Sequence, residues 1–323
     1  MEKQPLISFI ITAYNIPAPL LSDCIKSVLC LSLNQREREI IVVDDGSQSP
    51  AIDSIGSLAD DIIYIRQRNQ GLSVARNTGL TMASGRYIQF VDGDDTLLRV
   101  PYEHCLDIAR YHNPDIVLFH ESASLSAETP FTYEGPMTGS TFMRDNNLRA
   151  SACGYLFDKR TAGQLRFTPG TLHEDEEFTP QLLLRSERLY TTEAKAYYYR
   201  KREGSIMHAA DSDHTKKRLG DMEQILYRLQ RLVVPQVDKA AINRRIAQLT
   251  MDYIYNVIQL TGSRRTLNET LNRLSSKGLF PLPDKDYTAK YKYFRKMINN
   301  KYTRQLLFVA IKVGAENPLR RLL

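Results

Sequence analysis

Short apolar runs rich in Ile, Val, Tyr and Phe alternate with helical patterns through the first half of the chain. The runs occupy residues 6–15, 39–47, 61–67, 86–95 and 115–120. Between them, apolar residues at helical spacing predict helices after the first run, over about 71–85 and over about 100–112. Runs without polar alternation are typical of parallel strands covered on both faces. The pattern therefore predicts an α/β fold with a doubly wound, mostly parallel sheet.

The pattern changes from about Ser205 onward. The remaining sequence contains long helical segments and no strand signal, and Pro281 and Pro283 interrupt it. A chain of 323 residues is long enough for a main core of roughly 200 residues and a smaller second unit. We therefore expect an α/β domain in residues 1–205 and a helical region with a basic amphipathic tail in residues 206–323.

The net charge of +6 is unevenly distributed. Residues 285–323 hold ten lysines and arginines against two acidic residues, a balance of +8, so residues 1–284 sum to about −2. In this tail Tyr291, Phe294 and Ile298 recur at helical spacing beside basic residues. Such a helix suits either an anionic membrane surface or packing against the rest of the protein. The basic residues form no known nucleic-acid-binding motif, so we expect no nucleic-acid partner.

No stretch of the sequence has the pattern of a membrane-spanning helix or a secretory signal. A spanning helix needs about 18 or more consecutive apolar residues, and residues 1–9 lack a basic region followed by an apolar segment. We therefore expect a cytoplasmic protein, with the basic tail as a candidate membrane contact.

Polar residues stand where three of the apolar runs end. They are Thr12, Tyr14 and Asn15 after the first run, Asp44 and Asp45 after the second, and Asp92, Asp94 and Asp95 after the fourth. Ligands of open α/β sheets bind beyond the carboxyl ends of the strands. These residues therefore predict a binding site at that edge of the sheet.

The segment FVDGDD, residues 90–95, places three carboxylates within four positions. Like charges this close cost stability unless a cation compensates them, and Mg²⁺ or Mn²⁺ takes carboxylate oxygens together with phosphate oxygens. The segment predicts a divalent cation held by Asp94. The alternative is an acidic turn that caps the helix starting near Val100.

Two further segments carry candidate ligand contacts. In VVDDGS, residues 42–47, Asp45 is a candidate acceptor for the imide N–H of uracil and Asp44 a candidate for orienting the loop, although the segment also suits an ordinary turn after a strand. In NQGLSVARN, Gly71 permits a tight turn, and Arg76 lies in the first half of the helix that follows. A phosphate is favoured near a helix start and arginine pairs with two oxygens; the alternative is a solvated helical arginine.

A third acidic cluster, LHEDEEF, occupies residues 172–178. A carboxylate here can accept the proton of an attacking hydroxyl. The alternative is a helix start, where acidic residues are favoured by the helix dipole. Helical spacing places Phe178 toward the core.

Five segments, in their order along the chain, resemble family 2 glycosyltransferases with the GT-A fold, of the type found in bacterial surface polysaccharide assembly. They are SFIITAYN, VVDDGS, NQGLSVARNTGLTMASGRYIQFVDGDD, LHEDEEF and YYYRKREGSI, which together span about residues 8–206. The resemblance implies the following donor contacts: Thr12 and Tyr14 flanking the base, Asp45 on uracil, Arg76 on the base or diphosphate, Asp92 on the ribose or the metal shell, and Asp94 on the metal.

The resemblance also implies roles near the acceptor. Asp175 is the expected catalytic base, while Glu174 and Asp95 are expected at the acceptor or directly behind the metal ligands. Arg200 or Arg202 is expected to contact the pyrophosphate. Ser205 belongs to the same closing loop, and His208 is more typical of a surface residue than of a metal ligand.

The expected reaction is a single in-line displacement, because the chain holds no Ser-His-Asp or Cys-His set for a covalent intermediate. One displacement inverts the anomeric centre. We expect a UDP-hexose or UDP-N-acetylhexosamine donor, Mn²⁺ or Mg²⁺ as cofactor, and a glycan or lipid-linked acceptor, with the tail bringing the enzyme to the cytoplasmic face of the inner membrane. The alternatives are an inactive nucleotide-sugar-binding or scaffold subunit and a nucleotidyltransferase, although the latter needs a glycine-rich phosphate loop that ITAYNIPAP lacks.

Overall fold

The computed structural model describes residues 4–125, 130–200 and 212–316. The chain divides into two compact units, Met1–Phe142 with Asn147–His208 and Met143–Asn146 with Ala209–Leu323. We describe each unit by itself. The expected boundary at residues 205 and 206 lies outside the described residues and stays a prediction.

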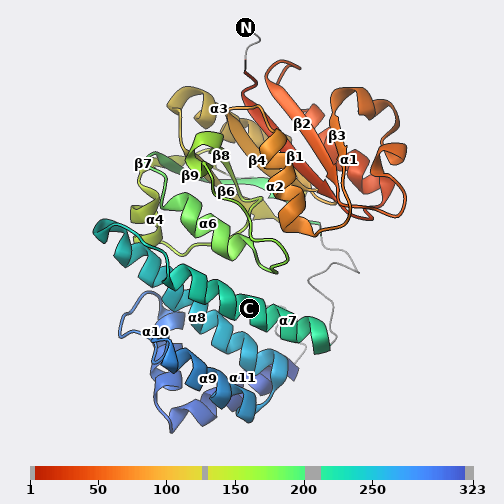
Figure 1. Cartoon of the computed structure of the whole chain (residues 1–323). Helices are drawn as coiled ribbons and strands as arrows, with labels where there is room; N and C mark the ends of the chain where they lie inside the picture. Colours follow the sequence, from red (N-terminus) through yellow and green to blue (C-terminus); the bar gives the residue numbers. More distant parts are fainter. Residues whose placement is uncertain (1–3, 126–129, 201–211, 317–323) are drawn as a thin grey trace. The chain divides into compact units, whose positions relative to one another are not determined.

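The first unit is built on a mixed sheet (Figure 1). Within the described residues it has nine strands, in the order β3-β2-β1-β4-β8-β6-β9-β5, with β7 paired to β9. Its strands are β1 (Ile7–Ala13), β2 (Arg38–Asp44), β3 (Ile63–Arg66), β4 (Tyr87–Asp92), β5 (Thr96–Leu97), β6 (Ile116–Ser122), β7 (Tyr133–Met137), β8 (Tyr155–Asp158) and β9 (Leu189–Tyr198). The α/β class predicted from the sequence is confirmed.

All pairings among β1, β2, β3 and β4 are parallel, whereas the rest of the sheet is mixed. β1 pairs in parallel with β2 and β4, and β2 with β3, whereas β8 runs antiparallel between β4 and β6. β9 is parallel to β6 and antiparallel to β5 and β7. The sheet is therefore mixed in its second half, because the chain returns to it there through the short strands β5, β7 and β8, which the apolar pattern did not show.

Six α-helices accompany this sheet within the described residues of the first unit. They are α1 (Ala18–Leu29), α2 (Leu72–Met82), α3 (Arg99–His112), α4 (Gly139–Asp145), α5 (Lys159–Ala162) and α6 (Asp175–Leu183). All seven residues of β1 are buried, as expected for a strand in the middle of such a sheet. α2 approaches β1 so closely that a Cβ atom on Gly79 would lie 2.2 Å from Cγ2 of Ile10.

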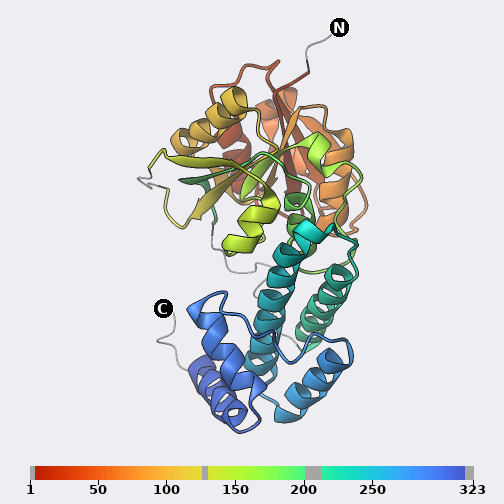
Figure 2. The same ribbon diagram turned by 90° about the vertical axis from the view of Figure 1, so that its left-hand side faces the viewer.

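The second unit is helical, as expected. Its helices are α7 (Ser212–Gln230), α8 (Lys239–Thr261), α9 (Arg264–Ser276), α10 (Ala289–Asn299) and α11 (Thr303–Glu316). Figure 2 shows these helices, coloured teal to blue, packed side by side, and α8 contacts α7, α9, α10 and α11. Among the described residues, no helix is both long enough and apolar enough to cross a membrane.

Candidate functional site

Three neighbouring strands bring their polar ends to one edge of the sheet. Register pairs Thr12 of β1 with Val43 of β2 and with Asp92 of β4, and Ala13 with Asp44. Because these strands are parallel, their carboxyl ends lie side by side. The site expected from the sequence therefore has a common edge, and the loops that follow β1, β2 and β4 surround it.

Asp44 is fully buried and holds the loop that follows β2. Its Oδ1 accepts a hydrogen bond from the backbone N–H of Ser47 at 2.9 Å, and its Oδ2 accepts from Ala51 N at 3.0 Å and the Tyr64 hydroxyl at 2.7 Å. Burial raises the pKa of this carboxyl, but these hydrogen bonds outweigh burial and hold the pKa below its usual value. Asp44 orients the loop, and its enclosure leaves no surface for direct contact with a ligand.

Asp45 fixes the loop that leads into α2. Its Oδ1 accepts hydrogen bonds from the Gln67 side chain at 2.7 Å and from Gln70 N at 3.0 Å, and its Oδ2 accepts from Gly71 N at 2.8 Å. Gly71 has a φ of +89° at the start of α2, a conformation that other residues rarely adopt. A carboxylate offers about four acceptor sites, so three of those of Asp45 are taken within the protein, and the residue is buried.

Arg76 connects the acidic segments at residues 90–95 and 172–178. Its Nη2 donates to Asp92 Oδ1 at 2.9 Å, and its Nη1 donates to Glu174 Oε1 at 2.5 Å. The side chain is 4% exposed, and its guanidinium lies 5.5 Å from the ring centre of Phe167 and 5.9 Å from that of Phe90. This burial excludes the alternative of a solvated helical arginine.

The electrostatics of Arg76 follow from this enclosure. Burial alone lowers its pKa, but the charges of Asp92 and Glu174 raise it well above the usual value, so the guanidinium is fully charged. Its Nε is buried and has no hydrogen-bond partner within the described part of the chain. A buried arginine held by two carboxylates and stacked on aromatic rings is a rigid link between the elements that carry those carboxylates.

Asp95 ties the end of β9 to the loop after β4. Its Oδ2 accepts from the Tyr197 hydroxyl at 2.8 Å and its Oδ1 from Arg200 N at 2.8 Å, while the Asp92 N–H donates to the Tyr197 hydroxyl oxygen at 3.1 Å. Burial raises the pKa of Asp95 to about 7, and Asp92 and Asp94 add to the rise. Asp95 therefore lies behind the exposed carboxylates. The side chain of Arg200 reaches toward Asp23, 3.5 Å away.

Asp92 and Asp94 suit a divalent cation that is also coordinated by the phosphate oxygens of a bound ligand. No group of three or more His, Cys, Asp or Glu side chains among the described residues could hold a metal ion by itself. Asp92 is one-third exposed on its side chain, and its Oδ1 contacts Arg76 and Thr12. Within the same residues no protein group donates to its Oδ2. Mg²⁺ and Mn²⁺ sites commonly combine one or two carboxylates with phosphate oxygens from the substrate, and these two carboxylates suit that arrangement.

Glu174 and Asp175 form the start of α6. Glu174 occupies the N-cap position and Asp175 is the first helical residue, with its Oδ1 accepting from Glu176 N at 2.9 Å. Asp175 lies close enough to Arg76 and Tyr155 to affect the pKa of each. The preceding residue, His173, has a φ of +61°. This backbone bend turns the acidic segment toward Arg76.

Phe178 anchors α6 in the core, as predicted. Its ring stacks on Phe167 with the centres 3.9 Å apart and an angle of 12° between the planes. Asn77, the neighbour of Arg76, makes two hydrogen bonds with the backbone of Phe167. Its Nδ2 donates to Phe167 O at 2.8 Å, and its Oδ1 accepts from Phe167 N at 2.9 Å. α2 therefore positions α6 by two adjacent side chains.

The remaining candidates differ in accessibility. Tyr14 directly follows β1 and is 46% exposed, whereas Thr12 is buried beside Asp92. Arg202, Ser205 and His208 lie outside the described residues. Tyr197 and Phe167 were not identified from the sequence; only the run of three tyrosines before Arg200 drew attention to Tyr197. Asn77 was expected beside Arg76 near a phosphate, and in the structure it bonds the Phe167 backbone instead.

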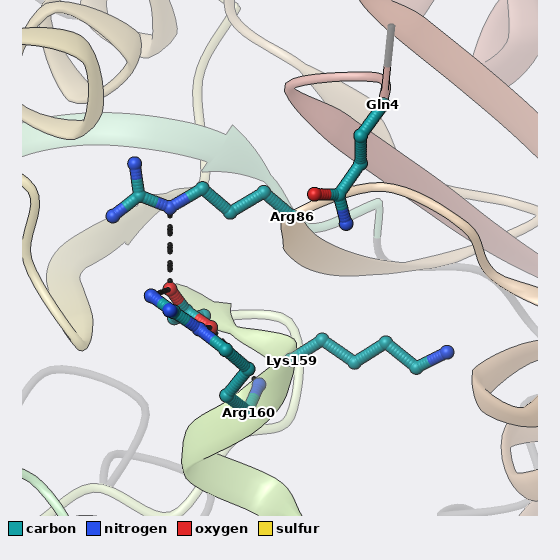
Figure 3. A pocket seen from close by; sticks show the side chains of 5 residues that line it. Gln4, Arg86, Lys159 and Arg160 are labelled. Atoms are coloured by element: carbon teal, nitrogen blue, oxygen red, sulfur yellow. Dashed lines mark hydrogen bonds and ion pairs between the residues drawn. The ribbon is translucent and has the colours of Figure 1, made fainter. Parts of the chain in front are cut away.

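A hollow of about 560 Å³ lies at the other end of the strands, lined by Gln4, Arg86, Asp158, Lys159 and Arg160 (Figure 3). Arg86 precedes β4, so this hollow is at the amino end of that strand, opposite Asp92. Both arginines pair with the buried Asp158, at 3.2 and 2.7 Å, and Lys159 donates to Ala83 O at 2.6 Å. The cations are thus engaged in holding the turn, and this hollow is no part of the candidate site.

Comparison with solved structures shows the class of fold. The chain is similar to S. aureus TarS 1-349 in complex with UDP-GlcNAc, with a TM-score of 0.60 and 17% identity over 93% of this chain and 92% of that one. It is also similar to the mannosyltransferase PcManGT from Pyrobaculum calidifontis in complex with GDP-Man and Mn²⁺, with a TM-score of 0.58 and 14% identity over 97% and 86% of the two chains. The fold is therefore GT-A-like, a mixed α/β sheet followed by helices.

Sequence comparison finds a matching family. Residues 8–152 match the profile of glycosyl transferase family 2, and the rest of the chain lies outside that match. Glycosyltransferase GlyA of Streptococcus pneumoniae serotype 4 is 31% identical over 223 residues, which are 62% of this chain and 31% of that protein. In three curated relatives the matched part is 31%, 33% and 62% of the relative's own length, so the chain spans less than two thirds of each.

Proposed function

We propose that the protein is an inverting glycosyltransferase, which moves a hexose-type sugar from a nucleoside diphosphate to an acceptor hydroxyl. One observation carries the proposal: Arg76 binds Asp92 and Glu174 at the same time. It therefore brings the carboxylates suited to a cation and those suited to proton transfer to one place, although they are some 80 residues apart in the chain. A binding protein for nucleotide sugars needs the first set and has no use for the second.

The donor proposed here is a UDP-hexose or a UDP-N-acetylhexosamine. In support, TarS has been solved with UDP-GlcNAc and PcManGT with GDP-Man and Mn²⁺, and both have this fold. In this chain Tyr14 is accessible for stacking on a base, and Asp45 is assigned to the imide N–H. Thr12, buried beside Asp92 at the end of β1, is assigned to the base with Tyr14. Arg200, with Arg202, is assigned to the pyrophosphate.

Asp92 and Asp94 are assigned to a divalent cation, Mn²⁺ or Mg²⁺. When bound, the cation neutralises the charge that the leaving diphosphate acquires. Asp95, closed off by Tyr197 and Arg200, holds the backbone of these ligands in place. Arg76 fixes Asp92 through Oδ1, so that Oδ2 would be left for the cation.

Asp175 is assigned the role of base. The acceptor oxygen attacks the anomeric carbon while its proton passes to the Asp175 carboxylate, the bond from that carbon to the phosphate oxygen breaks, and the nucleoside diphosphate leaves. Glu174, whose carboxylate is bound to Arg76, holds the start of α6 so that Asp175 faces the acceptor. One displacement inverts the anomeric configuration. The acceptor proposed is a glycan or a lipid-linked sugar of surface polysaccharide assembly.

The test is to incubate the purified protein with a panel of UDP- and GDP-sugars and Mn²⁺, and to measure nucleoside diphosphate release and the melting temperature. A donor that both stabilises the protein and is turned over supports the proposal. Stabilisation without turnover, with every acceptor offered, would instead identify an inactive nucleotide-sugar-binding subunit. Release of pyrophosphate from a nucleoside triphosphate and a sugar phosphate would identify a nucleotidyltransferase.

A further inference from the structure

The apolar stripe that the sequence predicts on α10 is not exposed at the surface. Tyr291, Phe294 and Ile298 are all buried within the second unit, where α10 packs on α8 and α11. The Tyr291 hydroxyl donates to Pro283 O at 3.2 Å. This stripe therefore belongs to the core of the helical unit and is closed to a membrane.

α11 is apolar on two opposite faces. Leu307, Phe308 and Ile311 are buried on the face that packs on the unit. Their neighbours Leu306, Val309 and Val313 are 66%, 45% and 58% exposed. The spacing of three and then four residues places these on one stripe of the helix, which we call the outer face of α11. An exposed helix with apolar residues on both sides is unusual unless its outer side also meets an apolar phase.

The residues around the outer face are basic and aromatic. Lys301 and Lys312 are exposed near the two ends of the stripe, and the Lys312 side chain extends beside Gly262 at the end of α8. Tyr302, 74% exposed, precedes the stripe and lies under the Lys301 ammonium, with 4.9 Å from Nζ to the ring centre. The sequence from 289 to 314 holds no acidic residue. Tyrosine and lysine beside an apolar stripe are the composition of a helix at a lipid–water interface.

We propose that the outer face of α11 lies on the surface of an anionic lipid bilayer. Leu306, Val309 and Val313 enter the region between headgroups and acyl chains, and the two lysines contact lipid phosphates. A second copy of the chain is the alternative occupant of this face, and the experiment below distinguishes it from a bilayer. The inference is independent of the sugar-transfer reaction.

The experiment is flotation of the purified full chain with vesicles of phosphatidylcholine alone or with about one third phosphatidylglycerol. We expect the unaltered protein to float with the anionic vesicles, less at high salt, and to stay below with neutral ones. The triple variant L306Q/V309Q/V313Q should float at least tenfold less, and K301Q/K312Q should lose the salt dependence. Glutamine is a good helix former, so the helix is retained. The matched control is Val237→Gln, an exposed valine outside α11.

Each other outcome overturns the inference. Equal flotation of the triple variant and the unaltered protein would exclude the outer face as the contact. A dimer in light scattering that the triple variant abolishes, without flotation of either form, would assign the face to a second copy. Stabilisation by UDP and Mn²⁺ is measured on every variant; its retention separates a failure at α11 from a failure of the proposed reaction.

Discussion

At the scale of single residues, Arg76 joins two acidic segments of the site. The sequence placed it near a ligand, whereas its two carboxylate and two ring neighbours are 14 to 98 positions away in the chain, which no local pattern can show. The same holds for Asp45, which the sequence identified as a base contact. Its bonds to residues 67–71 show that it also shapes the loop before α2.

Arg76→Lys tests the link between the two acidic segments. Lysine cannot reach both carboxylates with a planar fork, so one buried carboxylate loses its partner. We expect the free energy of unfolding to fall by about 2–4 kcal/mol and kcat/KM for sugar transfer to fall by about 100-fold or more. Urea denaturation and initial rates measure the two effects. Arg68→Lys, an exposed arginine nearby, should change neither, and unaltered activity of the Arg76 variant would contradict the role given to it.

Asp175→Asn tests the assignment of the base. The amide cannot accept the acceptor proton, so we expect kcat to fall by about 10²–10⁴-fold while donor binding, measured by calorimetry with UDP and Mn²⁺, stays within about twofold. The matched control is Asp107→Asn on α3, far from the sheet edge and more than half exposed on its side chain. If donor affinity falls together with kcat, Asp175 contributes to donor binding and is not the base.

At the scale of elements, the apolar pattern predicted β1 to β4, β6 and α1 to α3, and it missed β9 and three short strands. β5, β7 and β8 have two, five and four residues, and a strand that short carries no period of its own. Likewise the pattern placed an apolar stripe on α10 without showing what covers it. Periodicity reports which side of an element is apolar, and the partner of that side is a matter of tertiary packing.

Gly79→Ala tests the close contact of α2 with β1. The added Cβ would lie 2.2 Å from Cγ2 of Ile10, a stiff β-branched residue in a buried strand, so either the helix or the strand must shift. We expect a loss of about 1–3 kcal/mol in the free energy of unfolding. Gly220→Ala in α7 is the control, because nothing lies within 4 Å of its Cβ position. At position 220 alanine should raise the free energy of unfolding by about 0.5–1 kcal/mol. Equal changes in the free energy of unfolding at both positions would refute the close contact of Gly79 with Ile10.

At the scale of the whole molecule, the helical unit depends on a polar centre that the sequence did not reveal. Glu223 of α7 accepts from Tyr227 and Tyr253 at 2.5 Å each and from two nitrogens of Arg273 at 3.0 and 2.9 Å. Three helices thus meet at one carboxylate. Burial raises its pKa, but the bonds from Arg273 and the tyrosines outweigh burial and lower the pKa below its usual 4.5.

Glu223→Gln should therefore lower the stability of the protein by an amount that depends on pH. Because the pKa of Glu223 is lower in the folded state than in the unfolded state, its stabilisation is present above the unfolded value of 4.5 and is lost as the pH falls through the folded value. At pH 7 we expect the free energy of unfolding of the variant to be about 2 kcal/mol lower than that of the unaltered protein. This difference should disappear below pH 4.5, and urea denaturation across that range measures it. Glu269→Gln, an exposed partner of Arg265, should show a difference under about 0.5 kcal/mol at every pH.

The path of β9 has a consequence for anyone who wishes to shorten or recombine this protein. The stretch that the family profile recognises stops at residue 152, yet the sheet is completed by β8 and β9, and β9 is hydrogen-bonded to β5, β6 and β7. A fragment ending at residue 152 would leave the inner strand β6 without either neighbour and Asp95 without Tyr197. Chimaeras and truncations should be cut beyond Arg200, since the limits of sequence similarity are not the limits of the folded body.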